Sequence, residues 1–137
     1  MDHIDHEILE FLRENARASN NEIAAKVNLT EGAVRNRVKN LVASGVIKKF
    51  TVDTAADQIE AIVLIKTQTK GSKEILKRIR KFASRLFETA GEYDVATYLG
   101  AESVENINET VDKIRSVTGV ISTLTLLKIA DDKPTEL

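Results

Sequence analysis

The sequence predicts an α+β chain made of two units joined by a short linker. The first fifty residues contain three stretches with apolar residues at helical spacing, each opened by a residue that can cap a helix. Residues 61–129 instead hold short apolar runs and amphipathic stretches in the order β-α-β-β-α-β. Residues 53–60 between them are polar and weakly patterned, which is typical of a linker.

The sequence predicts three helices in the first unit. Asp5 can cap the first helix, which weakens over residues 15–19. Ser19 and Glu22 have the spacing of a capping box for the second helix, and Thr30 can cap the third. The apolar positions expected inside are Ile8, Leu9, Phe11, Leu12, Ile23, Ala24, Val27, Val34, Val38 and Leu41.

The last two of these helices are separated by the short turn Asn28-Leu29, the arrangement of a helix-turn-helix. Gly45 stands where a left-handed residue ends a helix, and residues 48–52 form an extended piece that can serve as a wing. We therefore expect a winged helix-turn-helix over residues 1–52.

The second unit is expected to have a ferredoxin-like βαββαβ fold over residues 61–130, followed by a tail at 131–137. Its first strand, Ala61–Ile65, is apolar throughout and should be buried on both faces. A turn at residues 91–94 joins the second and third strands, and Ser103 caps the second helix. The other predicted elements are a helix at 72–86, strands at 87–90 and 95–99, and a strand at 120–129.

Two helices can cover only one face of a four-stranded sheet. The last strand nevertheless carries apolar residues on both faces, with Val120, Leu124 and Leu126 on one and Ile121, Leu127 and Ile129 on the other. A second copy of the sheet is the simplest cover, which predicts an isologous dimer. The alternative is that the N-terminal unit folds back over the sheet.

Composition excludes several classes of function. The 137 residues contain no cysteine, which excludes disulfides and thiolate metal sites. Met1 begins a polar stretch and the chain has no long apolar run, so we expect no signal peptide, no membrane span and a cytoplasmic location. Its two histidines, His3 and His6, stand at the N-terminal end outside any expected pocket. We expect no catalytic residue, metal ion or cofactor.

The third helix carries the pattern of a DNA-reading element. Residues 31–49 hold five basic residues and one acidic residue, although the whole chain has a net charge of −1. Arg35 can pair with guanine and Asn36 with adenine, while Gly32 permits close approach to the DNA backbone. The predicted DNA-contacting residues are Thr30, Glu31, Gly32, Arg35, Asn36, Lys39, Lys48 and Lys49.

Plainer interpretations of these residues stay open. Arg35 and Lys39 can be solvated charges, Thr30 a helix cap alone, and Arg37 either a phosphate contact or a salt-bridge partner. The basic segment Lys70–Arg85 is interpreted as a solvated outer face, with DNA wrapping or oligomer contacts as the alternative.

Several short motifs occur in a specific order along the chain. They are Ile4-Asp5-x-x-Ile8-Leu9, Asn15-Ala16-Arg17, Ile23-Ala24, Val34-x-x-Arg37-Val38-x-x-Leu41, Gly45-Val46-Ile47, Gly91-x-Tyr93-Asp94 and Gly119-Val120. With these motifs in this order, the sequence resembles the leucine-responsive/asparagine-regulator (Lrp/AsnC) family of feast/famine transcription regulators. The resemblance extends over nearly the whole length of the chain.

This resemblance implies a dimer, commonly assembled into tetramers or octamers, that binds pseudo-palindromic operators in double-stranded DNA. It also implies an amino-acid effector near the Gly-x-Tyr-Asp turn, which makes Gly91, Tyr93 and Asp94 the effector candidates. Asp94 suits an ammonium group, although the motif can equally be a tight turn that needs these residues for its backbone. Further candidates are Ser122, Thr123 and Thr125, whose hydroxyls suit a carboxylate, and Glu102.

Two rival functions remain at this stage. An enzyme similar to the sirohaem decarboxylases would use histidines, and the chain offers only His3 and His6, without a Ser-His-Asp set or a glycine-rich phosphate loop. A sensing or scaffold module without DNA binding is the second rival, against which the basic stripe and Arg35-Asn36 argue.

Overall fold

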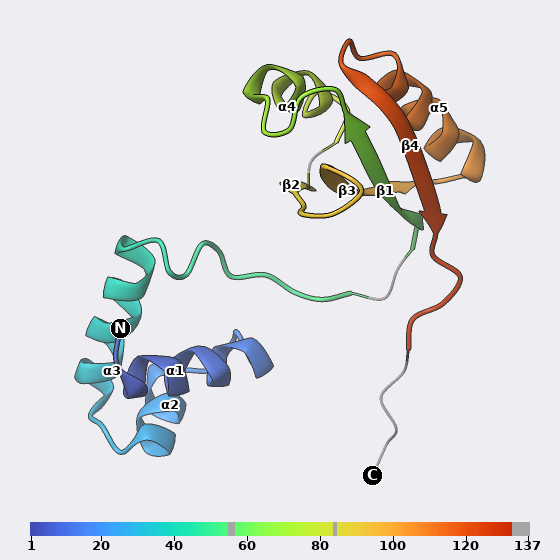
Figure 1. Cartoon of the computed structure of the whole chain (residues 1–137). Helices are drawn as coiled ribbons and strands as arrows, with labels where there is room; N and C mark the ends of the chain where they lie inside the picture. The colour runs from blue at the N-terminus through green and yellow to red at the C-terminus, as the bar shows by residue number, and fades with distance from the viewer. Residues whose placement is uncertain (55–56, 84, 133–137) are drawn as a thin grey trace. The chain divides into compact units, whose positions relative to one another are not determined.

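The computed structural model describes residues 1–54, 57–83 and 85–132 (Figure 1). The chain divides into two compact units, Met1–Thr54 and Ala55–Leu137, and the division falls within the segment 53–60. Residues 55–56 of the predicted linker, Ser84 of the predicted helix 72–86 and residues 133–137 of the predicted tail lie outside the described residues.

The first unit contains the helices α1 (His3–Glu14), α2 (Asn20–Val27) and α3 (Glu31–Ala43). Ser19 and Thr30 cap α2 and α3 as predicted, because each side chain accepts a hydrogen bond from a backbone N–H of the first helical turn. One core joins the three helices through Ile8, Ile23, Ala24, Val27, Val34 and Leu41.

The prediction that Asp5 caps α1 is wrong, since the helix begins earlier. Asp2 is the cap, and its side chain accepts a hydrogen bond from the Asp5 N–H at 2.9 Å. The Asp5 carboxylate accepts one in return from the Asp2 N–H at 3.2 Å, which completes a capping box. The first turn holds one apolar residue, Ile4, between polar ones, which is too little for the apolar pattern to reveal where the helix begins.

Gly45 follows the end of α3 with φ +78°, a left-handed conformation that glycine adopts without steric cost. Beyond it, the predicted extended piece 48–52 forms no regular strand within the described residues of this unit. A strand needs a neighbouring strand to pair with, and the unit Met1–Thr54 consists of helices and irregular chain.

The second unit is a ferredoxin-like fold with a four-stranded antiparallel sheet in the order β2-β3-β1-β4. Helices α4 and α5 pack on one face of the sheet (Figure 1), where they share a core with alternate residues of β1. The elements are β1 (Ile59–Thr67), α4 (Lys73–Ile79), β2 (Arg85–Glu88), β3 (Val95–Ala101), α5 (Val104–Arg115) and β4 (Val120–Leu127).

The first helix of this unit is shorter than predicted, and the next strand begins earlier. The helix was expected to reach Leu86 and the strand to cover 87–90, whereas α4 ends at Ile79 and β2 spans Arg85–Glu88. Phe82, Ala83 and Leu86 continue the helical spacing in the sequence. Pairing of Leu86 with Thr97 on β3 provides a competing set of backbone hydrogen bonds, and the strand prevails.

In a single chain, β1 is buried on one face only, contrary to the prediction. Ala61, Val63 and Ile65 are buried under the helices, while Ile62 on the other face is exposed. Tertiary packing decides this, because within the predicted strand Ala61–Ile65 the residues of both faces are apolar.

The predicted faces of the last strand also need correction. The pairing of β1 with β4 shifts register between Lys66 and Thr67, so Val120 packs against the core rather than on the face of Leu124 and Leu126. The strand ends at Leu127, and Ile129 lies beyond the sheet with 99% of its surface exposed.

Candidate nucleic-acid interface

The outer face of α3 presents the predicted DNA-reading residues. Val34 and Leu41 are buried in the helical core, which turns the opposite side of α3 outward. Arg35, Asn36 and Lys39 are exposed on that side, and Glu31 and Gly32 are half-buried at its start. The helix therefore offers a guanidinium and an amide, the two groups best suited to read guanine and adenine in a major groove.

Arg35 is already held in place. Its Nη1 donates to the two carboxylate oxygens of Glu31 at 3.0 and 3.2 Å, one helical turn away. An exposed pair at this spacing is worth about 0.3–0.5 kcal/mol, whereas a bidentate contact to guanine contributes about 1–3 kcal/mol of discrimination. Glu31 is therefore a weak partner for Arg35, which a guanine edge could displace.

Arg37 has a structural role, which decides between the two interpretations of that residue. Its Nη1 donates to Asp2 at 2.8 Å and to Asp5 at 3.1 Å, and its side chain is only 30% exposed. The hydrogen bond from Arg37, together with one from the Asp5 backbone, lowers the pKa of Asp2 from 3.8 to about 2. Arg37 thus ties α3 to the first turn of α1.

The remaining predicted contacts lie at the ends of α3. The Thr30 hydroxyl accepts a hydrogen bond from the Ala33 N–H at 3.1 Å, so its own proton is left to donate to a phosphate. Gly32 has room for a side chain, because an added Cβ would meet only Arg35 Nη2 at 3.6 Å, an ordinary contact. Lys48 and Lys49 are exposed in the irregular segment after α3.

The Gly91–Asp94 turn is held by a dense set of backbone bonds. Gly91 has φ +130°, a conformation that favours glycine. The Thr89 hydroxyl donates to the Tyr93 carbonyl at 2.8 Å, and the Asp94 N–H donates to the Ile65 carbonyl at 2.9 Å. The tight-turn interpretation of the motif is therefore physically sound, whatever else the turn does.

Asp94 is buried at the end of β1. Its Oδ2 accepts hydrogen bonds from the Thr67 N–H at 2.8 Å and the Thr67 hydroxyl at 3.2 Å. The Thr67 N–H is the main reason that the pKa of Asp94 lies below its usual range, with Lys70 and Lys66 acting in the same direction. Its Oδ1 has no hydrogen-bond partner among the described residues, and the nearest cation is Lys70 Nζ at 3.8 Å.

The predicted hydroxyls of β4 do not form one group. Thr123 pairs with Ile65 and Thr125 with Val63, so both lie on the helix-covered face of the sheet. Ser122 pairs with Lys66 on the opposite face, at the same end of β1 as Asp94. Glu102 is exposed in the bend between β3 and α5.

The face of the sheet opposite the helices carries a set of apolar residues, here called the open face. Cross-strand pairs place Ile62 beside Tyr98 and Leu126, and Leu64 beside Leu124. Sequence reasoning missed the part of this face on β2 and β3, although alternation along residues 85–88 and 95–101 was the available signal. The open face consists of Ile62, Leu64, Phe87, Tyr98, Leu124 and Leu126.

Two aromatic contacts organise the missed part of the open face. Arg85 lies over the Tyr98 ring at 4.4 Å, and the Phe87 and Tyr98 rings lie 6.2 Å apart. Apart from Leu64, which is half-buried, the apolar residues of this face are exposed in the single chain.

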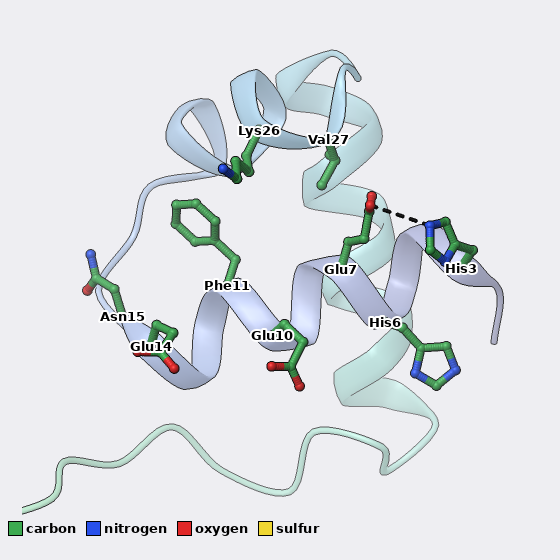
Figure 2. A pocket seen from close by; sticks show the side chains of 9 residues that line it. All are labelled: His3, His6, Glu7, Glu10, Phe11, Glu14, Asn15, Lys26 and Val27. Carbon is green, nitrogen blue, oxygen red and sulfur yellow. Dashed lines mark ion pairs between the residues drawn. The ribbon is translucent and has the colours of Figure 1, made fainter. Parts of the chain in front are cut away.

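A hollow between α1 and α2 corrects the expectation that the histidines lie outside any pocket. His3 and His6 both line it, together with Glu7, Phe11 and Val27 (Figure 2). His3 Nε2 lies 3.4 Å from Glu7 Oε1. Within residues 1–54, 57–83 and 85–132, no three His, Asp or Glu side chains are placed to hold a metal ion. None of the described helices has the length and apolar character needed to cross a membrane.

Comparison with known proteins identifies both units. A family described as winged helix-turn-helix DNA-binding matches residues 1–48. The HTH-type transcriptional regulator LysM of Sulfurisphaera tokodaii is 42% identical over 127 residues, covering 90% of this chain and 91% of LysM. The HTH-type transcriptional regulator FL11 of Pyrococcus furiosus is 30% identical over 141 residues, covering 98% and 93% of the two chains.

Solved structures show the same fold over the whole chain. The structure of E. coli AsnC matches with a TM-score of 0.79 at 19% identity, covering 100% of this chain and 97% of AsnC. A transcriptional regulator of Neisseria meningitidis in complex with L-Met matches with a TM-score of 0.79 at 21% identity, covering 98% and 94%. Taken with the exposed reading helix and the 42% identical regulator, these matches show that the chain belongs to the Lrp/AsnC family of DNA-binding transcription regulators.

Proposed function

We propose that this regulator reads its operator with the outer face of α3, acts as a homodimer joined through the open face, and responds to an amino acid at the Gly91–Asp94 turn. The observation that carries the first part is the exposed Arg35-Asn36 pair on a helix whose opposite side is buried. Lys39, Lys48 and Lys49 would contact phosphates and set the salt dependence of binding. A regulator that binds operator DNA would act in the cytoplasm.

Replacing Arg35 tests the reading of DNA. Operators are first selected from random duplexes by the protein itself, and affinity is then measured by fluorescence anisotropy. Arg35→Ala should weaken operator binding by about 1–3 kcal/mol and relax the preference at one base position. The matched control is Arg13→Ala, an exposed arginine of α1 that also pairs with a glutamate on its own helix. Equal effects of the two substitutions would contradict the assignment.

The dimer is supported by the open face. Its apolar side chains have no cover in the single chain, and stacking a second copy of the sheet would bury them around a two-fold axis. A two-fold dimer presents two α3 helices, which fits a pseudo-palindromic operator with two half-sites. Further assembly into tetramers or octamers would place several such pairs on one DNA.

The effector proposal is supported by Asp94 Oδ1, whose ionic neighbour Lys70 Nζ stays at 3.8 Å, beyond hydrogen-bond distance. Oδ1 is buried without a hydrogen-bond partner among the described residues, so an α-ammonium group would satisfy it. Lys66 and Ser122, paired on the open face at the same end of β1, supply a cation and a hydroxyl for a carboxylate. The L-Met complex of the Neisseria meningitidis regulator supports an amino acid as the class of ligand.

A thermal-shift screen against the twenty amino acids, with calorimetry on each hit, tests the effector site. Asp94→Asn keeps the shape of the side chain and an acceptor for Thr67 but removes the charge. This substitution should weaken the binding of each amino acid found in the screen by about tenfold or more. The reason is that a hydrogen bond to a charged group contributes roughly 1.5–3 kcal/mol. Asp112→Asn on α5 is the control. If no amino acid raises the melting temperature, or Asp94→Asn binds as wild type, the site is not here.

A further inference from the structure

The segment from Lys70 to Lys81 concentrates positive charge on the C-terminal unit. It holds six of the chain's 20 Lys and Arg residues and one of its 21 Asp and Glu residues. The rest of the chain therefore has 14 basic and 20 acidic residues, a net charge of −6. A basic patch on an otherwise acidic chain is not a consequence of overall composition.

The charges of α4 lie on the side away from the core. Ile75 and Ile79 are buried against the sheet, while Lys73, Lys77 and Lys81 are exposed. These lysines are four residues apart, so they follow one another along the outer surface of the helix and the turn after it. At 1.5 Å per residue the row is about 12 Å long.

The stability of α4 explains only part of this row, because Lys77 in the last turn favours the helix dipole whereas Lys73 in the first turn opposes it. Lysines four residues apart in a helix repel each other, as Lys73 and Lys77 do within α4. The one acid in the segment, Glu74, faces Arg78 at 3.5 Å rather than the lysines. Glutamate forms helices about as well as lysine, so local propensity does not explain a row of one sign. An anionic partner would relieve the repulsion.

We propose that the outer face of α4 contacts the phosphate backbone of DNA that flanks the operator. DNA is the polyanion that this regulator meets in any case, and a row of this length spans neighbouring phosphates of a strand. Lysine reaches phosphate as a flexible point charge, so the contact carries no sequence preference. The proposal rests on DNA binding by α3 and adds a second, sequence-independent surface.

Salt dependence on two DNA lengths tests the proposal. One duplex is limited to the operator and the other carries long flanks of random sequence. The test variant is Lys73→Gln with Lys77→Gln. The control is Lys113→Gln with Arg115→Gln, which removes the same charge from α5, the other outer helix. Binding of every variant to the operator-only duplex reports on α3 separately.

With the flanked duplex, the slope of log affinity against log salt should be less steep for the α4 variant than for wild type. The difference should be about 1.8 for each α4 that contacts DNA, since each of the two lysines contributes about 0.9. Between about 50 and 200 mM salt, wild type should thus lose about twelvefold more affinity than the α4 variant for each α4 that contacts DNA. Wild type and the α4 variant should bind the operator-only duplex with equal affinity. The α5 variant should have the same salt slope as wild type on both duplexes.

Other outcomes would overturn the proposal in distinguishable ways. Equal slopes for wild type and the α4 variant would make the patch a solvated surface. Equal reductions of the salt slope in the α4 and α5 variants would indicate that the overall electrostatic field of the protein acts on the DNA, rather than a contact by α4. A change in oligomer mass on light scattering without DNA would assign α4 to an acidic protein surface instead. Failure of wild type on the operator-only duplex would refute reading by α3, not the α4 contact.

Discussion

Two arginines of α3, two positions apart, show how position decides the role of a residue. Arg35 points away from the core and holds an exposed pair with Glu31, which DNA can displace. Arg37 lies beside the buried stripe and holds Asp2 and Asp5 on another helix. The same side-chain chemistry is available to DNA in one place and stabilises tertiary structure in the other, because helical geometry separates the two positions by about 200°.

Gly32 allows a prediction that separates folding from recognition. Its backbone needs no glycine and an added Cβ meets no close neighbour, so Gly32→Ala should raise the free energy of unfolding by up to about 1 kcal/mol. The same methyl group should crowd the DNA backbone and weaken operator binding by about fivefold or more, at the 1–3 kcal/mol typical of overpacking. Urea unfolding and anisotropy measure the two effects, with Asn21→Ala on α2 as control. Unweakened binding would show that DNA does not approach Gly32 closely.

At the scale of elements, ion pairs and caps link the first turn of α1 to α3. Asp2 takes part in the capping box of α1 and also accepts from Arg37, so one carboxylate both starts a helix and docks it on another. The orientation of α3 relative to α1 therefore depends on a charge near the N-terminus, far along the sequence from the residues proposed to contact DNA.

This link predicts a dependence of stability on pH. The pKa of Asp2 falls from 3.8 to about 2 on folding, so its contribution is complete above its ordinary pKa and is lost as the pH falls toward about 2. Asp2→Asn keeps a good cap but removes the charge, so its melting temperature should fall less than that of wild type over this range. Circular dichroism measures the profile. Glu10→Gln, whose partner Arg13 lies on the same helix, is the control and should follow wild type.

At the scale of the whole molecule, the C-terminal unit has more apolar surface than its own helices cover. α4 and α5 bury one face of the sheet, and the open face exposes Ile62, Phe87, Tyr98, Leu124 and Leu126. A monomer rarely keeps such a contiguous apolar patch without a function for it. Covering this patch in a dimer would also fix the number of reading helices at two.

The dimer is tested by placing a charge in the open face. Leu124→Glu should convert the protein to a monomer in analytical ultracentrifugation, because an isologous interface would bury the new carboxylate twice without a partner. Full burial of a leucine is worth about 1.5–3 kcal/mol, and this too would be lost twice. Ile129→Glu, beyond the end of β4 and fully in solvent, should leave the dimer intact. A dimeric Leu124→Glu protein would exclude the open face as the interface.

Local signals were sufficient for much of the fold. Ser19 and Thr30 mark helix starts, because a capping bond forms within three residues of its donor. Apolar periodicity placed the cores of both units and the order of strands and helices. The same signals failed at Asp2, where the first turn holds a single apolar residue, and at residues 80–88, where helical spacing continued into a strand. For the strand, the deciding partner is β3, which lies outside the stretch with helical spacing.

By itself, the sequence determined which residues line the reading helix, that the chain forms two units, and that its sheet has apolar residues on both faces. These properties depend on spacing along the chain, which periodicity records directly. Only the tertiary structure decided which face of β1 the helices cover, and that Arg37 clamps α1. It also decided that Thr67 bonds one oxygen of Asp94 while the other lies 3.8 Å from Lys70 Nζ, and that Thr123 and Thr125 lie on the helix-covered face. Each of these depends on cross-strand register or on contacts between residues far apart in sequence, where pairing energy rather than local pattern selects the partner.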